Sequence, residues 1–185
     1  MPTSLKDLAK PVYKGFLSVV DIEGSSTAWL MIQALVSAYG EDGAKEVLKG
    51  IYNNAGDHLE ESGSGPIKKV RAGEVAIGFG LRHQAVADKN FGLPIDFVDP
   101  TEGNFSLTES VAVIDKGDKT NTKAMEMAEC IIQKGRSKLI KTYPNPLYEG
   151  ETAEKSNESA YPKKFSEKLT VDLLEKHKKL SEECK

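Results

Sequence analysis

The chain of 185 residues is poor in the residue types that build disulfide frameworks and metal sites, with only two cysteines and three histidines. Cys130 lies within a helical pattern and Cys184 is one residue from the end, a spacing that fits neither a disulfide framework nor a set of metal ligands. His58, His83 and His177 are far apart in the sequence. We therefore expect two free thiols, no metal site and no resident cofactor.

Long apolar runs are also absent. No stretch reaches the roughly 18 apolar residues of a membrane-spanning helix. The first residues, MPTSLKDLAKPVYKG, lack the apolar region of an export signal. Either the protein is cytoplasmic, or the segment that carries an export signal is absent from this sequence, and composition leaves both possibilities open.

An excess of positive charge is missing as well. The formal net charge is −3, and the basic residues are spread along the chain, so we expect no nucleic-acid partner. A hydrophobic content of 39% with 29% charged residues is typical of an ordinary soluble globular protein. The length suits one domain, or one lobe and part of a second.

Catalytic signatures cannot be assembled from this sequence. GxSxG, HExxH and CxxC do not occur, and GxGxxG is not completed. A nucleotide P-loop is excluded after Gly63, because Lys68 stands where the second glycine is needed and Val70 stands where Ser or Thr is needed. These absences argue against hydrolase or zinc chemistry, and we expect a binding protein and not an enzyme.

Short apolar runs alternate with helical patterns along most of the chain. The hydrophobic pattern predicts strands at residues 16–20, 75–79, 95–98 and 110–114. Helical spacing and helix-end residues predict helices at residues 25–40, 42–52, 66–73, 83–91, 121–134 and 171–183. This order indicates an α/β fold, with a mostly parallel sheet flanked by helices.

Ligands of such sheets bind beyond the carboxyl ends of the strands, where helix amino termini present free N–H groups. The first loop of this kind contains Ser25, Ser26 and Thr27, whose hydroxyls suit a phosphate, a phosphonate or a carboxylate. Ordinary helix capping also explains each of these residues taken alone. All three together favour an anion site.

A second loop, Gly63-Ser64-Gly65-Pro66, opens the next predicted helix. Small residues let a ligand approach the backbone, and Ser64 adds a hydroxyl beside Gly65, so the loop resembles an anion-binding nest. A flexible turn explains the same residues.

The third loop contains Arg82 and His83, which could bind an anion through the guanidinium and a further hydrogen bond. Glu102 and Glu109 are acidic loop positions that suit sugar hydroxyls or an ammonium group. Each of these residues also fits a solvated surface position.

The order of several segments is similar to that of a known family. DLAKPVYKGFLSVVD followed by SST, then IKKVRAGEVAIGFG, then GLPIDFVDPTEGNFSLTESVAVIDKG and a helix ending near KLI, resembles the ferric-ion and organophosphate branch of the type II periplasmic solute-binding proteins of ABC transporters. The similarity covers about residues 7 to 150. It implies capture of a small solute outside the cytoplasmic membrane by closure of two lobes, and delivery to a membrane-bound ABC permease, with no bond broken.

The resemblance also implies a division of the chain. Residues 1–109 would form the second ligand-binding lobe, residues 110–139 would cross back to a first lobe absent from this sequence, and residues 140–185 would return to pack on the second lobe. Exposed apolar surface on 110–139 and self-association are then expected. The full-length protein would be periplasmic or at the cell surface.

The resemblance leaves the solute open between two classes. Iron-binding members carry adjacent tyrosines after the strand that corresponds to residues 75–79, where this chain has Arg82-His83-Gln84. Because Arg82 repels a cation and attracts an anion, we favour a sugar phosphate or a phosphonate over ferric iron. Two other classes remain: a cytoplasmic effector-binding domain of a transcription regulator, and an enzyme on the same scaffold.

Overall fold

Two units of the chain differ in how they pack in the computed structural model, which describes residues 1–185. Unit 1 consists of Met1–Ser106 and Ser159–Lys185, and unit 2 of Leu107–Glu158. The sequence placed the corresponding boundaries after residues 109 and 139; that residues 110–139 cross to another lobe stays a prediction. None of the helices combines the length and the apolar character that a membrane span needs.

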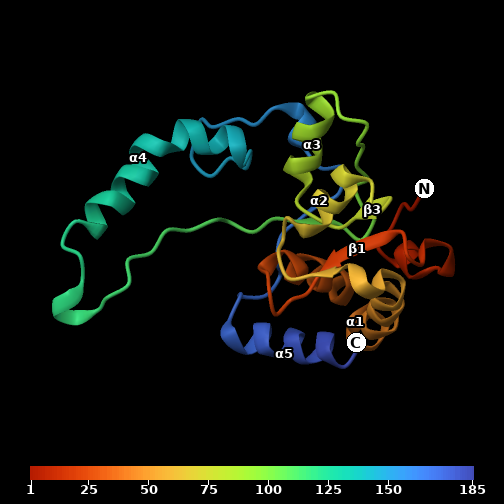
Figure 1. Cartoon of the computed structure of the whole chain (residues 1–185). Helices are drawn as coiled ribbons and strands as arrows, with labels where there is room; N and C mark the ends of the chain where they lie inside the picture. Colours follow the sequence, from red (N-terminus) through yellow and green to blue (C-terminus); the bar gives the residue numbers. More distant parts are fainter. The chain divides into compact units, whose positions relative to one another are not determined.

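The sheet of unit 1 is built around β1 (Leu17–Val20), whose four residues are all buried. β1 pairs in parallel with β2 (Leu59–Glu60) on one side and with β3 (Ile77–Gly78) on the other. A central parallel strand is covered on both faces, which explains why all four residues are buried, including Ser18, whose hydroxyl donates to His58 O at 2.9 Å. Figure 1 shows α1 (Ser26–Ala55) on one face of β1 and α2 (Gly65–Ala72) on the other.

α1 is made of two helical stretches that meet at Gly40, where φ is 70° and ψ is 177°. Glycine suits this backbone because a Cβ atom disfavours positive φ. The prediction of two helices interrupted at this residue is confirmed. α2 ends at Gly73 in the left-handed conformation, and α3 (Arg82–Asn90) follows β3, both as the sequence predicted.

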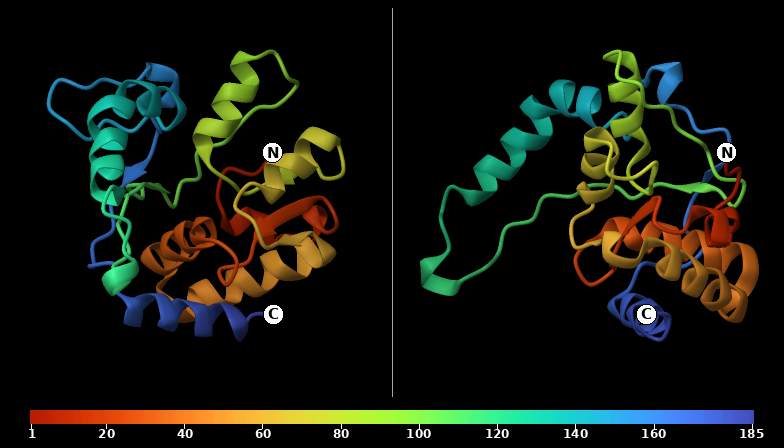
Figure 2. Two further views of the ribbon diagram at one scale, coloured as in Figure 1. Left: turned by 60° about the vertical axis from the view of Figure 1, so that its left-hand side comes forward. Right: turned by 45° about the vertical axis from the view of Figure 1, so that its right-hand side comes forward.

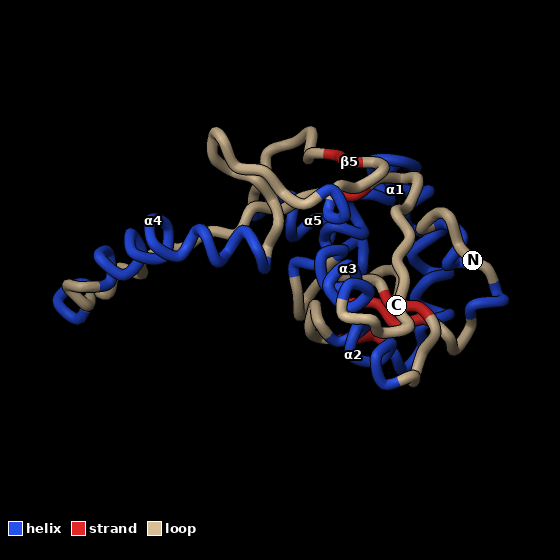
Figure 3. Tube along the Cα trace, turned by 90° about the horizontal axis from the view of Figure 1, so that it is seen from above, coloured by secondary structure: helices blue, strands red, loops and turns tan.

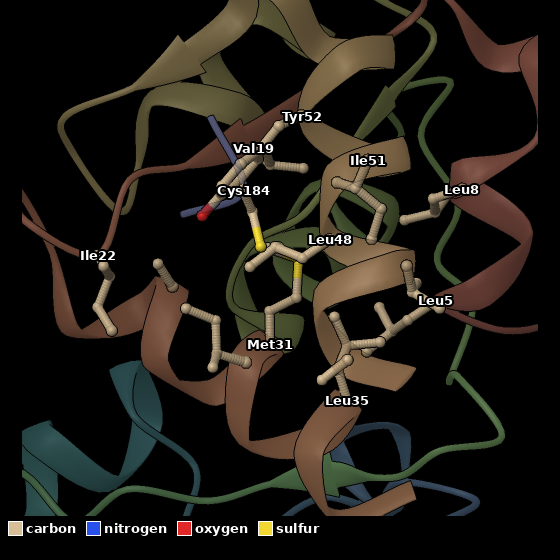
Figure 4. Close-up of a cluster of buried hydrophobic side chains, with 14 of the residues drawn as sticks. Leu5, Leu8, Val19, Ile22, Met31, Leu35, Leu48, Ile51, Tyr52 and Cys184 are labelled. Carbon is tan, nitrogen blue, oxygen red and sulfur yellow. The ribbon is translucent and has the colours of Figure 1, made fainter. Parts of the chain in front are cut away.

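The core of unit 1 lies between β1, α1, the amino-terminal segment and α5 (Val171–Glu182). Figure 4 shows the side chains of this cluster, with Leu35, Leu48 and Ile51 on α1. All three are fully buried. Full burial of a side chain of this size contributes roughly 1.5–3 kcal/mol.

The predicted C-terminal helix is present as α5, which lies alongside α1 in both views of Figure 2. Thr170 caps α5, since its hydroxyl accepts a hydrogen bond from the Leu173 N–H at 3.2 Å. Deeper in the contact, the hydroxyls of Tyr52 and Ser181 are 2.6 Å apart and buried. Burial raises the pKa of Tyr52 to about 12.

Two predicted strands are wrong, because residues 95–98 and 110–114 form no ladder. In the first segment the backbone makes local bonds, from Ile95 N to Leu93 O at 2.7 Å and from Phe97 N to Asp96 Oδ1 at 2.8 Å. An apolar run predicts burial but does not supply a hydrogen-bonding partner, and a strand needs both.

Three short strands were missed. β2 is one, and β4 (Asn104–Phe105) and β5 (Pro162–Lys163) pair in parallel with each other. Figure 3 shows how short the strands are compared with the helices. Two-residue strands carry too few side chains to show an alternating pattern, so sequence reasoning has little to detect.

Unit 2 contains one long helix, α4 (Ala124–Thr142), and Ala128 is its only buried residue. The apolar exposure expected for residues 110–139 is observed, and involves the side chains of Val111, Ile114, Met125, Met127, Ile131 and Ile132. Self-association through this surface stays a prediction.

Candidate functional site

Three loops leave the sheet of unit 1 at the same edge. The strand order is β2-β1-β3 and all pairs are parallel, with Val20 opposite Glu60 and Ser18 opposite Gly78. The carboxyl ends therefore coincide, and the loops that begin at Asp21, at Glu61 and at Phe79 start side by side, the arrangement in which open α/β sheets bind ligands.

The first loop, residues 21–27, ends in the first turn of α1. Ser25 is the N-cap residue, and its hydroxyl accepts a hydrogen bond from the Thr27 N–H at 3.3 Å. Thr27 is buried, whereas Ser26 is exposed. Helix capping is therefore part of the role of Ser25, and the first turn still presents N–H groups that lack partners within the helix.

The second loop is packed directly on the first. Asp21 N donates to Glu60 O at 2.8 Å, and a Cβ atom at Gly24 would overlap the backbone of Glu61. A Cβ at Gly63 would overlap both the Thr27 hydroxyl and the Ser25 hydroxyl. Gly63 thus contacts the first turn of α1, and only a residue without a side chain allows that approach.

Ser64 and Gly65 follow at the start of α2. The Ser64 hydroxyl lies 3.3 Å from the Ser62 hydroxyl and makes no cap bond to the helix, and Gly65 is buried. A Cβ at Gly65 would lie 2.8 Å from Glu60 Oε2, so a carboxylate already occupies this helix end. Of the two helix starts, that of α1 is the better seat for an added anion.

Lys69 balances this carboxylate, with its ammonium 3.3 Å from Glu60 Oε1 and 3.5 Å from Glu74 Oε2. It also lies 3.2 Å from His58 Nδ1. These carboxylates raise the pKa of Lys69 even though burial acts in the opposite direction and is the largest single influence. Because Lys69 already has these partners, it is not a ready counterion for a solute.

Arg82, at the start of α3, is engaged by a carboxylate. Its Nε donates to Asp99 Oδ1 at 2.7 Å and its Nη2 to Asp99 Oδ2 at 3.4 Å, and its guanidinium lies 4.4 Å from the centre of the Phe97 ring. To contact an anion directly, the guanidinium of Arg82 would have to bind Asp99 and the anion together, or break its ion pair with Asp99. His83 lies on the same helix and is half-buried.

Glu102 has a structural position that the sequence did not indicate. The side chain is buried, and its oxygens accept bonds from Leu5 N and Lys6 N, each at 2.9 Å, and from the Tyr39 hydroxyl at 2.8 Å. Burial, together with the bond to Glu102, raises the pKa of Tyr39 to about 12. The geometry therefore does not favour the predicted contact of Glu102 with a solute.

The remaining predicted residue, Glu109, is exposed and belongs to unit 2. No group of three or more His, Cys, Asp or Glu side chains is placed to hold a metal ion. Cys130 and Cys184 are free thiols, the first exposed and the second buried. The structure thus brings Ser25 and Thr27 together with Gly63, and gives Arg82 and Glu102 other partners.

Comparison with known proteins identifies the family. Residues 1–166 match the family model of the bacterial extracellular solute-binding proteins. This chain belongs to that family. An uncharacterized protein of Haemophilus influenzae is 28% identical to this member over 139 residues, which are 75% of this chain and 40% of the relative.

Three solved structures are similar to this chain. The periplasmic binding protein AfuA from Actinobacillus pleuropneumoniae, with exogenous fructose-6-phosphate bound, is 31% identical over 56% of this chain, with a TM-score of 0.53. The periplasmic binding protein P5PA is 20% identical over 99% of the chain, with a TM-score of 0.69. Iron-bound HitA from Pseudomonas aeruginosa is 19% identical over 100%, with a TM-score of 0.62.

The chain spans only part of each relative, namely 32% of AfuA, 57% of P5PA and 61% of HitA. The similarity to P5PA and HitA concerns the fold, and confirms the predicted α/β architecture of part of a periplasmic binding protein. The family consists of extracellular or periplasmic binding proteins and not of enzymes, in agreement with the predicted class.

Proposed function

We propose that this chain forms part of a solute-binding protein of an ABC importer, and that the start of α1 holds the anionic group of a sugar phosphate or a phosphonate. The close approach of Gly63 to Ser25 and Thr27 carries this proposal. It places two hydroxyls and the first-turn N–H groups of α1 at one point of the sheet edge. Helix amino termini of this kind attract phosphate through N–H donors and the positive end of the helix dipole.

The proposed roles follow from burial and existing bonds. Ser25, Ser26 and Thr27 would hold the anionic group, with Ser26 the most accessible of the three. Ser64 and Gly65 would form the adjoining wall. We leave Glu102 out, because its carboxylate already accepts four hydrogen bonds from within unit 1.

Arg82 and His83 would reinforce the anionic group from the third loop. The ion pair with Asp99 holds the Arg82 side chain in place, and the positively charged guanidinium stays at this edge of the sheet. A charge held in this way can attract a solute over several ångströms, although the neighbouring carboxylate weakens the attraction.

The solute of AfuA supports the organophosphate class, because that relative was solved with fructose-6-phosphate and is 31% identical in the shared part. Ferric iron is the alternative, supported by a structure that resembles this chain in fold alone. Closure of a second lobe on the solute, and recognition of the closed form by the permease, complete the proposed mechanism.

Calorimetric titration of this chain with fructose 6-phosphate, inorganic phosphate, methylphosphonate and ferric citrate tests the proposal. We expect Thr27→Val, which keeps the shape of the side chain, to weaken binding of the phosphate compounds by about 10- to 100-fold, because a hydrogen bond to a charged group contributes about 1.5–3 kcal/mol. The matched control is Ser137→Ala, an exposed hydroxyl of α4.

The control should leave the affinity unchanged. A second measurement is the thermal shift, since a ligand at about 100 times its dissociation constant stabilises the folded state by about 2.7 kcal/mol. Binding of ferric citrate without any phosphate compound would refute the organophosphate class. Equal losses in Thr27→Val and Ser137→Ala would refute the location of the site.

A further inference from the structure

Two ion pairs connect the C-terminal helix with the candidate anion loop, residues 21–27. Lys185, just beyond the end of α5, lies 2.7 Å from Asp21 Oδ2, and both side chains are largely covered. Lys178, on α5, lies 3.3 Å from Glu23 Oε2. The carboxylate partners raise the pKa of Lys185 above its ordinary value although burial acts in the opposite direction. α5 therefore contacts the loop near its first residue and again two residues later.

A buried hydrogen bond connects the same helix with the first turn of α1. The indole N–H of Trp29 donates to Nδ1 of His177 at 2.7 Å, and both side chains are almost fully buried. Trp29 lies two residues beyond Thr27, directly behind the loop. Because Nδ1 accepts this bond, the His177 ring is neutral and carries its proton on Nε2.

Only one side of each contact lies within the match to the family model. That match ends at residue 166, and the other side is on α5, which begins at Val171, or just beyond it. The shared feature of Lys178, His177 and Lys185 is that each binds the segment that leads into the first turn of α1.

We propose that α5 positions the candidate anion loop, and that His177 is the positioning residue, because its neutral ring holds Trp29 behind Ser25 and Thr27. This inference rests on the proposed function, since it assigns to α5 the task of ordering that site. A loop held in its binding conformation loses less conformational entropy when it binds, so its affinity is higher. Loosening α5 should weaken solute binding without touching any residue that contacts the solute.

The environment of His177 makes this positioning sensitive to pH. The charged groups around the ring are Lys176 on α5, Glu41 on α1, and Glu167 in the segment before α5. Burial, followed by the Lys176 charge, lowers the pKa of His177, while the two carboxylates act in the opposite direction. Lys176 is itself paired with Glu41, which reduces the effect of both charges on the ring.

A proton on Nδ1 would turn the acceptor into a donor that faces the indole N–H. Since the pKa of the docked ring is below the ordinary value of 6.5, the docked form binds fewer protons than the released form. Docking of α5 is therefore complete above the ordinary pKa of histidine and is lost as the pH falls through the lowered pKa. Acid should release the loop.

The test compares the unmodified chain with His177→Asn and Lys185→Met. The His177→Asn variant keeps an acceptor oxygen near the position of Nδ1 but does not titrate, so it is the matched control. Hydrogen exchange of the amides of residues 21–27, corrected for intrinsic rates, is measured between about pH 7.5 and pH 5, alongside titration with fructose 6-phosphate.

We expect exchange of the loop to rise by about tenfold toward acid pH in the unmodified chain and to stay flat in His177→Asn. Lys185→Met should raise exchange of the loop at every pH. Phosphate esters also titrate near pH 6, but this affects all variants equally, so the difference between the profiles reports His177.

Each outcome decides between the two ideas. If hydrogen exchange of residues 21–27 changes neither with pH nor in the Lys185→Met variant, the positioning role of α5 is refuted. If fructose 6-phosphate binds but its affinity does not follow the exchange of the loop, the link between α5 and the site is refuted. If the loop loosens as expected and no variant binds any phosphate compound, the positioning stands and the proposed function fails.

Discussion

Unit 1 and unit 2 each contain a long helix, and the two helices differ in what they bury. α1 of unit 1 contributes fully buried Leu35, Leu48 and Ile51 to a continuous core, whereas α4 of unit 2 buries only Ala128. An apolar stripe becomes a core only where a second surface covers it, and most helical stability comes from such packing. The comparison shows that apolar side chains on a helix add to a core only where other elements cover them.

Polar interactions also divide between the units. In unit 2 they shape local turns, as where Arg136 donates to both oxygens of Glu151 at 2.6 and 2.7 Å and to Asn145 O at 2.9 Å. In unit 1 buried polar groups join distant segments, as where Asn54 donates to Leu8 O and Lys10 O at 2.7 and 2.8 Å. In unit 1, long-range polar contacts therefore accompany the core. In unit 2, where α4 buries only Ala128, these polar contacts are between residues close in the sequence.

The largest expected effect is on the core itself. Leu48→Ala should destabilise the protein by about 2–5 kcal/mol, because it removes a fully buried side chain and leaves a cavity. Ile132→Ala, at a side chain that is 44% exposed on α4, should change the stability by less than about 0.5 kcal/mol. Urea unfolding of the two variants makes the comparison, and equal losses would mean that α4 is packed in solution.

A smaller effect is expected at Glu102 and Glu109, two acidic residues for which the sequence predicted the same contact with a solute. Glu102→Ala should cost about 1–3 kcal/mol, because it leaves the Leu5 and Lys6 N–H groups and the Tyr39 hydroxyl without their acceptor. Glu109→Ala should be nearly neutral, since Glu109 is exposed. Chemical denaturation measures both. A loss of phosphate binding in fully folded Glu102→Ala would instead support the ligand role.

The smallest effect concerns the acid titration of unit 2. The bonds from Arg136 and from the N–H groups of Leu147 and Tyr148 lower the pKa of Glu151 to about 2, from an ordinary value of 4.5. The stabilisation of this turn is therefore complete above pH 4.5 and is lost as the pH falls through about 2.

NMR signals of residues 147–151, followed during acid titration, report this step. In Arg136→Met the midpoint should move back toward the ordinary value, because the main cause of the shift is removed. An unchanged midpoint in that variant would show that the turn is held by the backbone bonds alone.

Sequence reasoning found the elements that carry their own signals. Gly40 and Gly73 ended helices as predicted, and the strand predicted at residues 16–20 is present as the fully buried β1, Leu17–Val20, with Phe16 outside it and exposed. The prediction of strands failed at residues 95–98 and 110–114, where the apolar pattern is typical of a strand but no neighbouring strand pairs with the segment. Pairing depends on residues far away in the sequence, which a local window does not contain.

The candidate site divides in the same way. Ser25 and Thr27 could be selected from the sequence because hydroxyl residues at a helix start have a known use. Nothing in the sequence showed that Gly63 would contact them, that Asp99 would engage Arg82, or that Glu102 would cap a distant segment. Those partners are separated by 17 to 97 residues along the chain.

The sequence alone determined the family, the α/β class and the presence of hydroxyl residues at the start of α1, because these follow from composition, local pattern and the order of segments. The tertiary structure decided which hydroxyls meet, which charges are already paired and which helix supports the loop. Such decisions require two surfaces to meet, and only the folded chain brings His177 against Trp29, 148 residues earlier.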